Sequence, residues 1–206
     1  MEKNWTRIVY AVAFVALCCL TASAQDKGEQ QNYTHFSKWG LSFDYPKEWQ
    51  EHPADEVAMM KESLGRELRP YGRDLQEFAM IVGPNDETAL LVAKYTTPRA
   101  MKPSEFIEER KRVYDDAKRA GDVTKMNHVK ETTIAKLPAV EEDVERSNGG
   151  RGRTHKVIDG TTVFEISFVA NNARQFSKYL AVLDHLVSSI KVAGKRERPQ
   201  NEGGQK

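Results

Sequence analysis

The sequence predicts an α+β fold in which helices pack on a largely antiparallel β-sheet. Apolar residues alternate with polar ones in several short segments separated by turn residues, which is typical of β-hairpins. Two longer stretches repeat apolar residues at helical spacing. The chain shows no regular strand–helix–strand repeat, so a doubly wound parallel sheet is not expected.

Composition excludes several classes of protein. The chain has 206 residues, with 31 Lys and Arg against 30 Asp and Glu, and 39% of it is hydrophobic. These values exclude a multi-span membrane protein and a collagen-like chain. A nucleic-acid partner is not expected either, because the basic excess that attracts phosphates is absent.

The N-terminus has the pattern of a secretory signal peptide over residues 1–24. Lys3 and Arg7 precede an apolar run over residues 8–20, and Ala22 and Ala24 supply a small-residue cleavage site before Gln25. The run is shorter than the roughly 20 residues that span a bilayer, which disfavours an uncleaved anchor. We therefore expect export to the periplasm or the extracellular space, and no transmembrane segment in the mature form.

A lipid-modified terminus is the alternative, because Cys18 and Cys19 lie in this segment. Leu17 and Cys18 precede them, where a lipobox needs Gly, Ala or Ser. Cleavage after Ala24 removes both cysteines, which excludes cysteine nucleophiles and thiolate zinc sites from the mature chain.

The remaining chain is expected to form one domain with polar ends. Residues 25–34 form a polar linker, residues 35–193 a single globular domain, and residues 194–206 a disordered polar tail. A domain of this length can bury a sizeable core.

Strands and helices alternate irregularly in the first half of that domain. A strand is expected over 41–45, and a pair of strands over 78–82 and 88–95 is joined by the Gly-Pro-Asn-Asp turn. A helix is expected between them, because Val57, Met60, Leu64 and Leu68 recur at helical spacing and would form one apolar face.

Hairpins between two helices fill the second half. A helix from Ser104 ends at Gly121, which tolerates a left-handed conformation. Strands follow over 124–134, 139–146, 153–158 and 161–169, with a glycine-rich hairpin tip at 147–152. A long amphipathic helix over 176–190 closes the domain.

Two segments resemble PsbP-like domains, which share the Mog/PsbP fold with the DcrB proteins. The segment FSKWGLSFDYPKEW over 36–49 resembles the N-terminal part of such domains. Their C-terminal part is resembled by the strand at 164–168, followed by the last helix and the sequence SSIKV at 188–192. The resemblance implies an α/β/α sandwich, and its members are mostly non-enzymatic extrinsic or adaptor proteins. Lys136 departs from the glycine that such domains often carry, and the N-terminal extension of plant PsbP is absent.

No catalytic motif supports an enzyme. The five histidines form no HExxH or HxH pair, and neither a GxSxG elbow nor a GxxxxGK[ST] loop occurs. His52 with Asp55 and Glu56 is the densest set of metal-ligand types, but it also reads as a helix start with acids in the first turn. We therefore expect no catalytic or metal-binding residues and no cofactor.

A locally basic hairpin is the first candidate binding site. It carries five residues, Arg146, Arg151, Arg153, His155 and Lys156. They could contact an anionic surface or partner. The alternative is a solvated hairpin whose charges discourage edge pairing.

N-terminal aromatic residues are the second candidate. Six lie close together in sequence: Tyr33, Phe36, Trp39, Phe43, Tyr45 and Trp49. Most are expected in the core. Tyr33 and Trp39 lie nearest the linker and are the candidates for a ligand groove.

These observations support three hypotheses of function. The first is an exported, non-enzymatic PsbP-like domain that binds a protein or cell-envelope partner. The second is a small-molecule or lipid-binding module of the envelope. The third, less favoured, is a hydrolase whose active-site residues are distant in sequence.

Overall fold

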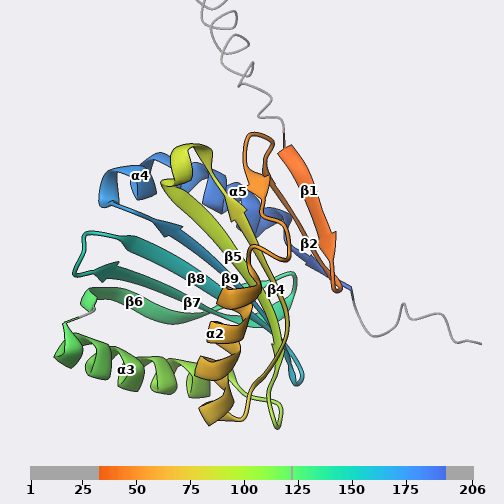
Figure 1. Ribbon diagram of the computed structural model, residues 1–206. Helices are drawn as coiled ribbons and strands as arrows, with labels where there is room; N and C mark the ends of the chain where they lie inside the picture. The colour runs from red at the N-terminus through yellow and green to blue at the C-terminus, as the bar shows by residue number, and fades with distance from the viewer. Residues whose placement is uncertain (1–32, 122, 194–206) are drawn as a thin grey trace, which may run out of the picture. The chain divides into compact units, whose positions relative to one another are not determined.

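The computed structural model of the protein describes residues 33–121 and 123–193, and its elements are labelled in Figure 1. In chain order they are β1 (Tyr33–Lys38), β2 (Leu41–Pro46), β3 (Gln50–Glu51), α2 (Ala58–Leu68), η1 (Arg69–Tyr71), β4 (Asp74–Val82), η2 (Pro84–Asp86), β5 (Thr88–Thr96), α3 (Pro103–Ala120), β6 (Val123–Ile134), β7 (Leu137–Arg146), β8 (Arg151–Asp159), β9 (Thr162–Ala170), α4 (Ala173–Lys178), α5 (Leu180–Ser189) and β10 (Lys191–Val192).

The strands form two sheets in which every pairing is antiparallel. Seven strands lie in the order β3-β4-β5-β9-β8-β7-β6, and three lie in the order β1-β2-β10. The prediction of a largely antiparallel sheet with packed helices is therefore confirmed.

Both faces of the seven-stranded sheet are covered. One face carries α4, α5 and the small sheet, and a core cluster there includes Phe43, Ile166, Phe168, Phe176 and Leu183. The other face carries α2 and α3, and its core includes Leu68, Tyr95, Phe106 and Val140. The sheet lies between these layers in Figure 1, which gives the expected α/β/α sandwich.

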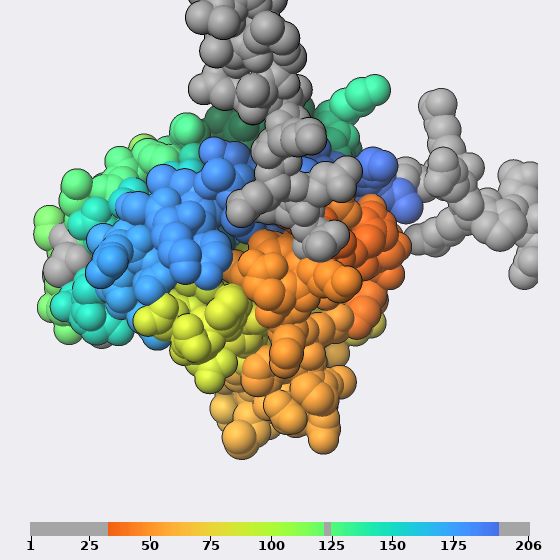
Figure 2. All heavy atoms as spheres, turned by 90° about the horizontal axis from the view of Figure 1, so that it is seen from above, coloured from red at the N-terminus to blue at the C-terminus, as the bar shows by residue number. Residues whose placement is uncertain are grey.

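The small sheet joins the two ends of the described domain. Val192 of β10 pairs with Leu41 of β2, and the Asp44 amide donates a hydrogen bond of 2.8 Å to Ser189 Oγ at the end of α5. Figure 2 shows the blue C-terminal helices beside the orange N-terminal strands. The first hairpin and the last helix therefore form one packed unit.

Residues at both ends of helix α3 explain why it begins and ends where it does. Pro103 occupies the first helical position, where its missing N–H is no loss. The Glu105 carboxylate accepts a hydrogen bond of 2.8 Å from the Lys102 amide, and Arg99 also donates to this carboxylate. Gly121 ends the helix with φ of 82°.

The closing helix differs from the expectation of one continuous helix over 176–190. Tyr179 breaks it into α4 and α5 with non-helical dihedral angles (φ −102°, ψ 10°). The Tyr179 ring packs edge-on against Trp49, with centroids 5.5 Å apart, and Phe176 packs on Phe168. Tertiary packing of these rings overrides the helical pattern of the segment.

Three short strands were not predicted, and one strand is longer than expected. Tyr33 and Thr34, assigned to the linker from sequence, begin β1, while β3 and β10 have two residues each. Strand β4 begins at Asp74, four residues before Phe78. The predicted signal segment, most of the linker and the polar tail lie outside the described residues.

Candidate functional site

The five residues of the predicted basic hairpin do not lie on one surface. Side chains alternate across strand β8, so Arg151, Arg153 and His155 face α4 and α5 while Lys156 faces α3. Lys156 and His155 are buried, and of the five only Arg146, at the end of β7, is exposed.

Asp143 neutralises two of these arginines from the neighbouring strand β7. Its fully buried carboxylate accepts hydrogen bonds from Arg151 Nε (3.1 Å), Arg153 Nη2 (2.9 Å) and Asn127 Nδ2 (2.8 Å). Burial alone would raise the pKa of Asp143, but these donors outweigh it and hold the pKa below its usual value. The Arg151 guanidinium also lies 4.3 Å from the Phe176 ring centroid. The arginines are therefore engaged within the domain.

A pattern in the sequence could have predicted this pairing. Acids at 141, 143 and 145 alternate along β7, and basic residues at 151, 153 and 155 alternate along β8. The observed register sets Glu145 opposite Arg151, Asp143 opposite Arg153 and Glu141 opposite His155. Opposite charges directly across two strands stabilise a sheet, which accounts for the basic residues without a partner molecule.

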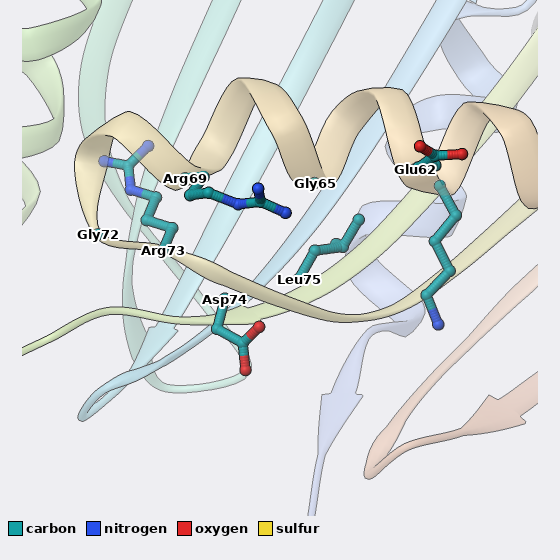
Figure 3. A pocket seen from close by; sticks show the side chains of 8 residues that line it. Glu62, Gly65, Arg69, Gly72, Arg73, Asp74 and Leu75 are labelled. Carbon is teal, nitrogen blue, oxygen red and sulfur yellow. The ribbon is translucent and has the colours of Figure 1, made fainter.

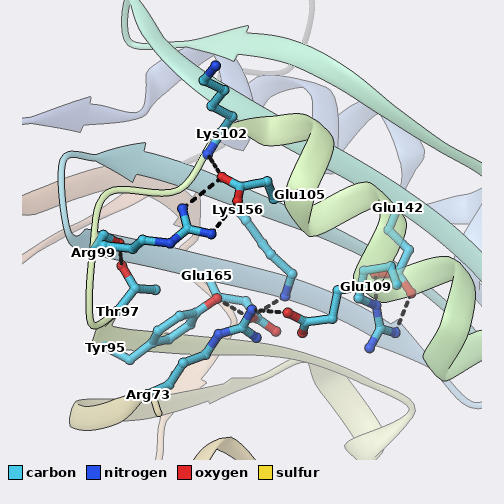
Figure 4. Close-up of polar contacts among 11 residues, drawn as sticks. Arg73, Tyr95, Thr97, Arg99, Lys102, Glu105, Glu109, Glu142, Lys156 and Glu165 are labelled. Atoms are coloured by element: carbon cyan, nitrogen blue, oxygen red, sulfur yellow. Dashed lines mark hydrogen bonds and ion pairs between the residues drawn. The ribbon is translucent and has the colours of Figure 1, made fainter. Parts of the chain in front are cut away.

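Lys156 belongs to a buried ionic network between the sheet and α3, drawn in Figure 4. Lys156 pairs with Glu165, and Tyr95 donates a hydrogen bond of 3.4 Å to the same carboxylate. Nearby, Arg73 pairs with Glu109 at 2.6 Å. A further pair in the same layer joins Arg110 to Glu142, at 2.7 Å from Arg110 Nε.

Shifted pKa values follow from this enclosure. Burial alone would raise the pKa of Glu165, but Lys156 outweighs it and holds the pKa below its usual value. Burial raises the pKa of the Tyr95 phenol well above its usual value, and Glu165 adds to the rise. Since three cations face three carboxylates, the network holds α3 on the sheet and keeps Glu165 ionised.

Figure 3 shows a cleft of about 480 Å³ between α2 and the start of β4. Arg69 runs along the cleft toward Gly65, and Asp74 also lines the cleft. Arg73, which also lines it, is already paired with Glu109. Charges of both signs line this cleft, so it favours no single ligand chemistry.

Trp39 lines a second groove, of about 600 Å³, between the β1–β2 turn and α2. Its lining residues are Lys38, Trp39, Glu51, His52, Ala54, Val57, Ala58, Lys61, Glu62, Glu77, Phe78 and Ala79. We call this the Trp39 groove. Its walls include apolar side chains, and its polar rim includes the ion pair of Lys38 with Glu51.

The six N-terminal aromatics divide as expected between core and partly exposed positions. Four are buried in the core: Phe36, Phe43, Tyr45 and Trp49. Tyr33 and Trp39 are half-buried but lie apart, since Tyr33 stacks on His185 at 3.9 Å and does not line the Trp39 groove.

The large exposed apolar side chains of the described domain lie on α2 and η1. Met59 is 79% exposed, Met60 is 40% exposed and Tyr71 is 47% exposed. Met60 was expected on the packed face of this helix. Met59 and Met60 lie in the same helix as three residues that line the Trp39 groove, so an apolar helix surface adjoins a partly apolar groove.

His52 and its neighbours form a turn before α2 instead of its first turn. Helix α2 begins at Ala58 without an acid in its first turn, and His52 Nδ1 lies 2.9 Å from Glu56 Oε2. Among the described residues, no group of three His, Cys, Asp or Glu side chains could hold a metal ion.

Comparison with known proteins rests on structure alone, because neither a family model nor a curated protein matches the chain. The solution structure of cyanobacterial PsbP from Synechocystis sp. PCC 6803 is similar, with a TM-score of 0.55 and 11% identity. The match covers 80% of this chain and 95% of that one. The fold is PsbP-like. This agrees with the resemblance of residues 36–49 and of the C-terminal segment, and at this identity it establishes the fold alone.

A crystal structure from Bacteroides thetaiotaomicron overlays more weakly. Its TM-score is 0.46 at 11% identity, and the match covers 82% of this chain and 51% of that one. This weaker likeness adds nothing to the assignment of a PsbP-like fold. Within residues 33–121 and 123–193, none of the helices combines the length and apolar character needed to cross a bilayer.

Proposed function

We propose that this chain is an exported PsbP-like domain that binds a protein partner of the cell envelope through α2 and the Trp39 groove, without catalysing a reaction. The signal-like segment over 1–24 supports export. The observation that carries the binding surface is the exposure of Met59, Met60 and Tyr71 on one helical segment. Exposed apolar surface beside a groove is typical of interaction sites.

The chemistry of this surface favours a partner with apolar anchor side chains. Methionine side chains adapt to irregular apolar surfaces and are frequent at binding faces. The Trp39 groove offers Phe78 and Val57 below a rim of paired charges. An apolar side chain inserted there would be surrounded by a polar rim, as in the central contacts of protein interfaces.

Site-specific photo-crosslinking tests this proposal. A benzophenone side chain placed at Met59 should give a discrete adduct in cells that export the protein, and Met60→Glu should abolish that adduct. The same group at Lys118, exposed on α3, is the matched control and should give none. Equal adducts from positions 59 and 118, or none from position 59, would contradict the proposal.

The basic hairpin is less suited to such a test. Reversing the charges of Arg151, Arg153 and Lys156 would leave Asp143 and Glu165 without their cations, so lost binding would report lost folding. Arg146 is exposed and takes no part in the ion pairs with Asp143 and Glu165, so Arg146→Glu tests binding by the hairpin without disturbing these pairs.

Export is tested separately. Intact mass measurement of the protein recovered from the envelope should give a chain that begins at Gln25, if cleavage follows Ala24. If the mass shows a chain that retains residues 1–24, or one that carries a lipid-modified cysteine, the protein is anchored to the membrane and the secreted form is contradicted.

A small apolar or amphipathic ligand in the Trp39 groove is the second candidate, because the groove volume of about 600 Å³ suits a small molecule. Native mass spectrometry of protein from the envelope should then show a bound mass that Ala54→Trp displaces. Ala54 is exposed in the groove, and Ala173→Trp on α4 is the control. A protein adduct at Met59, with no small-molecule mass bound to the unmodified protein, would favour the first candidate.

A further inference from the structure

A separate pocket of about 380 Å³ lies between α5 and the sheet, distant in sequence from the Trp39 groove. It is lined by Thr133, Ile134, Ala135, Glu141, Arg153, His155, Asp184, Val187 and Ser188. Asp184 and Ser188 of α5 are exposed at its rim, whereas His155 of β8 is buried. The pocket therefore leads from solvent to a buried imidazole.

His155 has unmet hydrogen-bonding capacity in this pocket. The residue is 3% exposed, and neither Nδ1 nor Nε2 has a hydrogen-bond partner among the described residues. Burial lowers the pKa of His155 to about 4, against the opposing effect of Glu141, so the ring is neutral at pH 7. A neutral imidazole presents one donor and one acceptor, and buried polar groups are nearly always paired.

The wall formed by the β6–β7 turn is conformationally constrained. Ala135, which lines the pocket, has φ of 52°, and Lys136 beside it has φ of 64°. Side-chain-bearing residues rarely adopt these values, but a two-residue hairpin turn requires them at both of its central positions. The tight turn fixes the position of Thr133 and Ile134 at the pocket wall.

The charges around the imidazole balance each other. Two acids and two bases act on it: Glu141, Asp184, Arg153 and Lys130. Glu141 also accepts from His128 at 2.6 Å and from Lys130 at 3.2 Å, and Arg153 is paired with Asp143. A charged ligand would meet a like charge on one side, whereas a neutral ligand with adjacent donors and acceptors would not.

We propose that this pocket binds a neutral, hydroxyl-rich ligand of about the size of one sugar ring, with His155 as its buried contact. A hydroxyl group can donate to one imidazole nitrogen and accept from another N–H. The Ser188 hydroxyl donates to the His185 carbonyl and keeps its lone pairs available to a ligand. The volume corresponds to roughly a dozen water molecules, which is about the number of heavy atoms in one hexose.

Three probes that share one ring and differ in charge test the proposal. The mature protein is titrated with D-glucose, D-glucosamine or D-glucuronate while histidine ring nitrogens are observed by NMR. Glucose should shift the His155 nitrogens saturably, with an affinity roughly tenfold higher than that of either charged sugar. No saturable shift with any sugar means that the pocket holds water only and overturns the proposal. A preference for a charged sugar overturns it as well.

Two variants separate loss of the site from loss of folding. Ser188→Trp closes the rim at an exposed position of α5 and should abolish the glucose response of the His155 ring. Ala181→Trp, at another exposed position of α5 that does not line the pocket, is the matched control and should leave the response unchanged. A response retained in Ser188→Trp would place the sugar elsewhere and contradict the assignment.

Discussion

At the scale of single residues, two positions carry a cost in folding free energy. Lys136 adopts a left-handed backbone conformation, and His155 is buried without a hydrogen-bond partner among the described residues. His155 lines the pocket between α5 and the sheet, and Lys136 follows Ala135, which lines the same pocket. For each residue, a substitution and a measurement of the free energy of unfolding can determine this cost.

Replacement of Lys136 by glycine should stabilise the domain. The two-residue turn between Ile134 and Leu137 requires positive φ at Ala135 and Lys136, which costs a side-chain-bearing residue about 1 kcal/mol. Lys136→Gly should raise the free energy of unfolding by about 0.5–1 kcal/mol in urea denaturation. Gly160→Ala is the control: φ is 63° with no atom within 4 Å, so it should destabilise by a similar amount.

Removal of the His155 imidazole should change how stability depends on pH. The folded pKa of about 4 lies below the ordinary value of 6.5, so between these values the unfolded chain binds the proton and the folded chain does not. The free energy of unfolding should therefore fall by on the order of 3 kcal/mol as pH decreases from 6.5 to 4. In His155→Gln this fall should be absent, whereas an unchanged slope would show that other groups cause it.

At the scale of elements, strands β7 and β8 are held together by a ladder of opposite charges as well as by backbone pairing. Asp143 lies at its centre and contacts two arginines and Asn127. The arginines in turn lie over Phe176 of α4, which links the hairpin to the helix above it. The ladder therefore couples sheet register to helix packing.

The variant Asp143→Asn tests this coupling. It leaves Arg151 and Arg153 without their carboxylate in a largely buried site, and we expect a loss of about 3 kcal/mol in chemical denaturation. Asp116→Asn removes an exposed pair with Arg119 and should change stability by less than about 0.5 kcal/mol. Equal effects of the two variants would show that burial does not matter here.

At the scale of the described domain, the two sheets share one core. Phe36, Leu41 and Phe43 of the small sheet belong to the same cluster as Ile81 and Ile166 of the large one. Such shared packing favours a single cooperative unfolding transition. The small sheet is thus an integral part of the domain and not an appendage.

The variant Leu41→Ala should therefore weaken the whole domain. Leu41 is buried in this cluster, and its truncation should cost about 2–5 kcal/mol. The unfolding transitions followed by tryptophan fluorescence, which reports on Trp39 and Trp49, and by far-UV circular dichroism should shift together. Transitions that separate would show that the small sheet unfolds independently.

The sequence allowed most of the large sheet and both of its helical layers to be predicted, because two-residue and helical periodicities mark them directly. It did not reveal β3 and β10, since two-residue strands have no periodicity, or the break at Tyr179, which depends on Trp49. The charge of the basic hairpin was visible, but its burial depended on pairing with β7. The Trp39 groove and the His155 pocket join residues distant in sequence, so no local motif marks them.

The pairing of β1 and β10 on either side of β2 has a mechanical consequence. Both strands run antiparallel to β2, so they run parallel to each other. Opposing forces applied at Tyr33 and Ala193 would shear them along β2 and load their hydrogen bonds together rather than one after another. Single-molecule stretching between these residues should thus meet higher resistance than stretching across the β7–β8 hairpin, whose ends would peel apart bond by bond. A domain held in this way would keep its fold while tension acts along the chain.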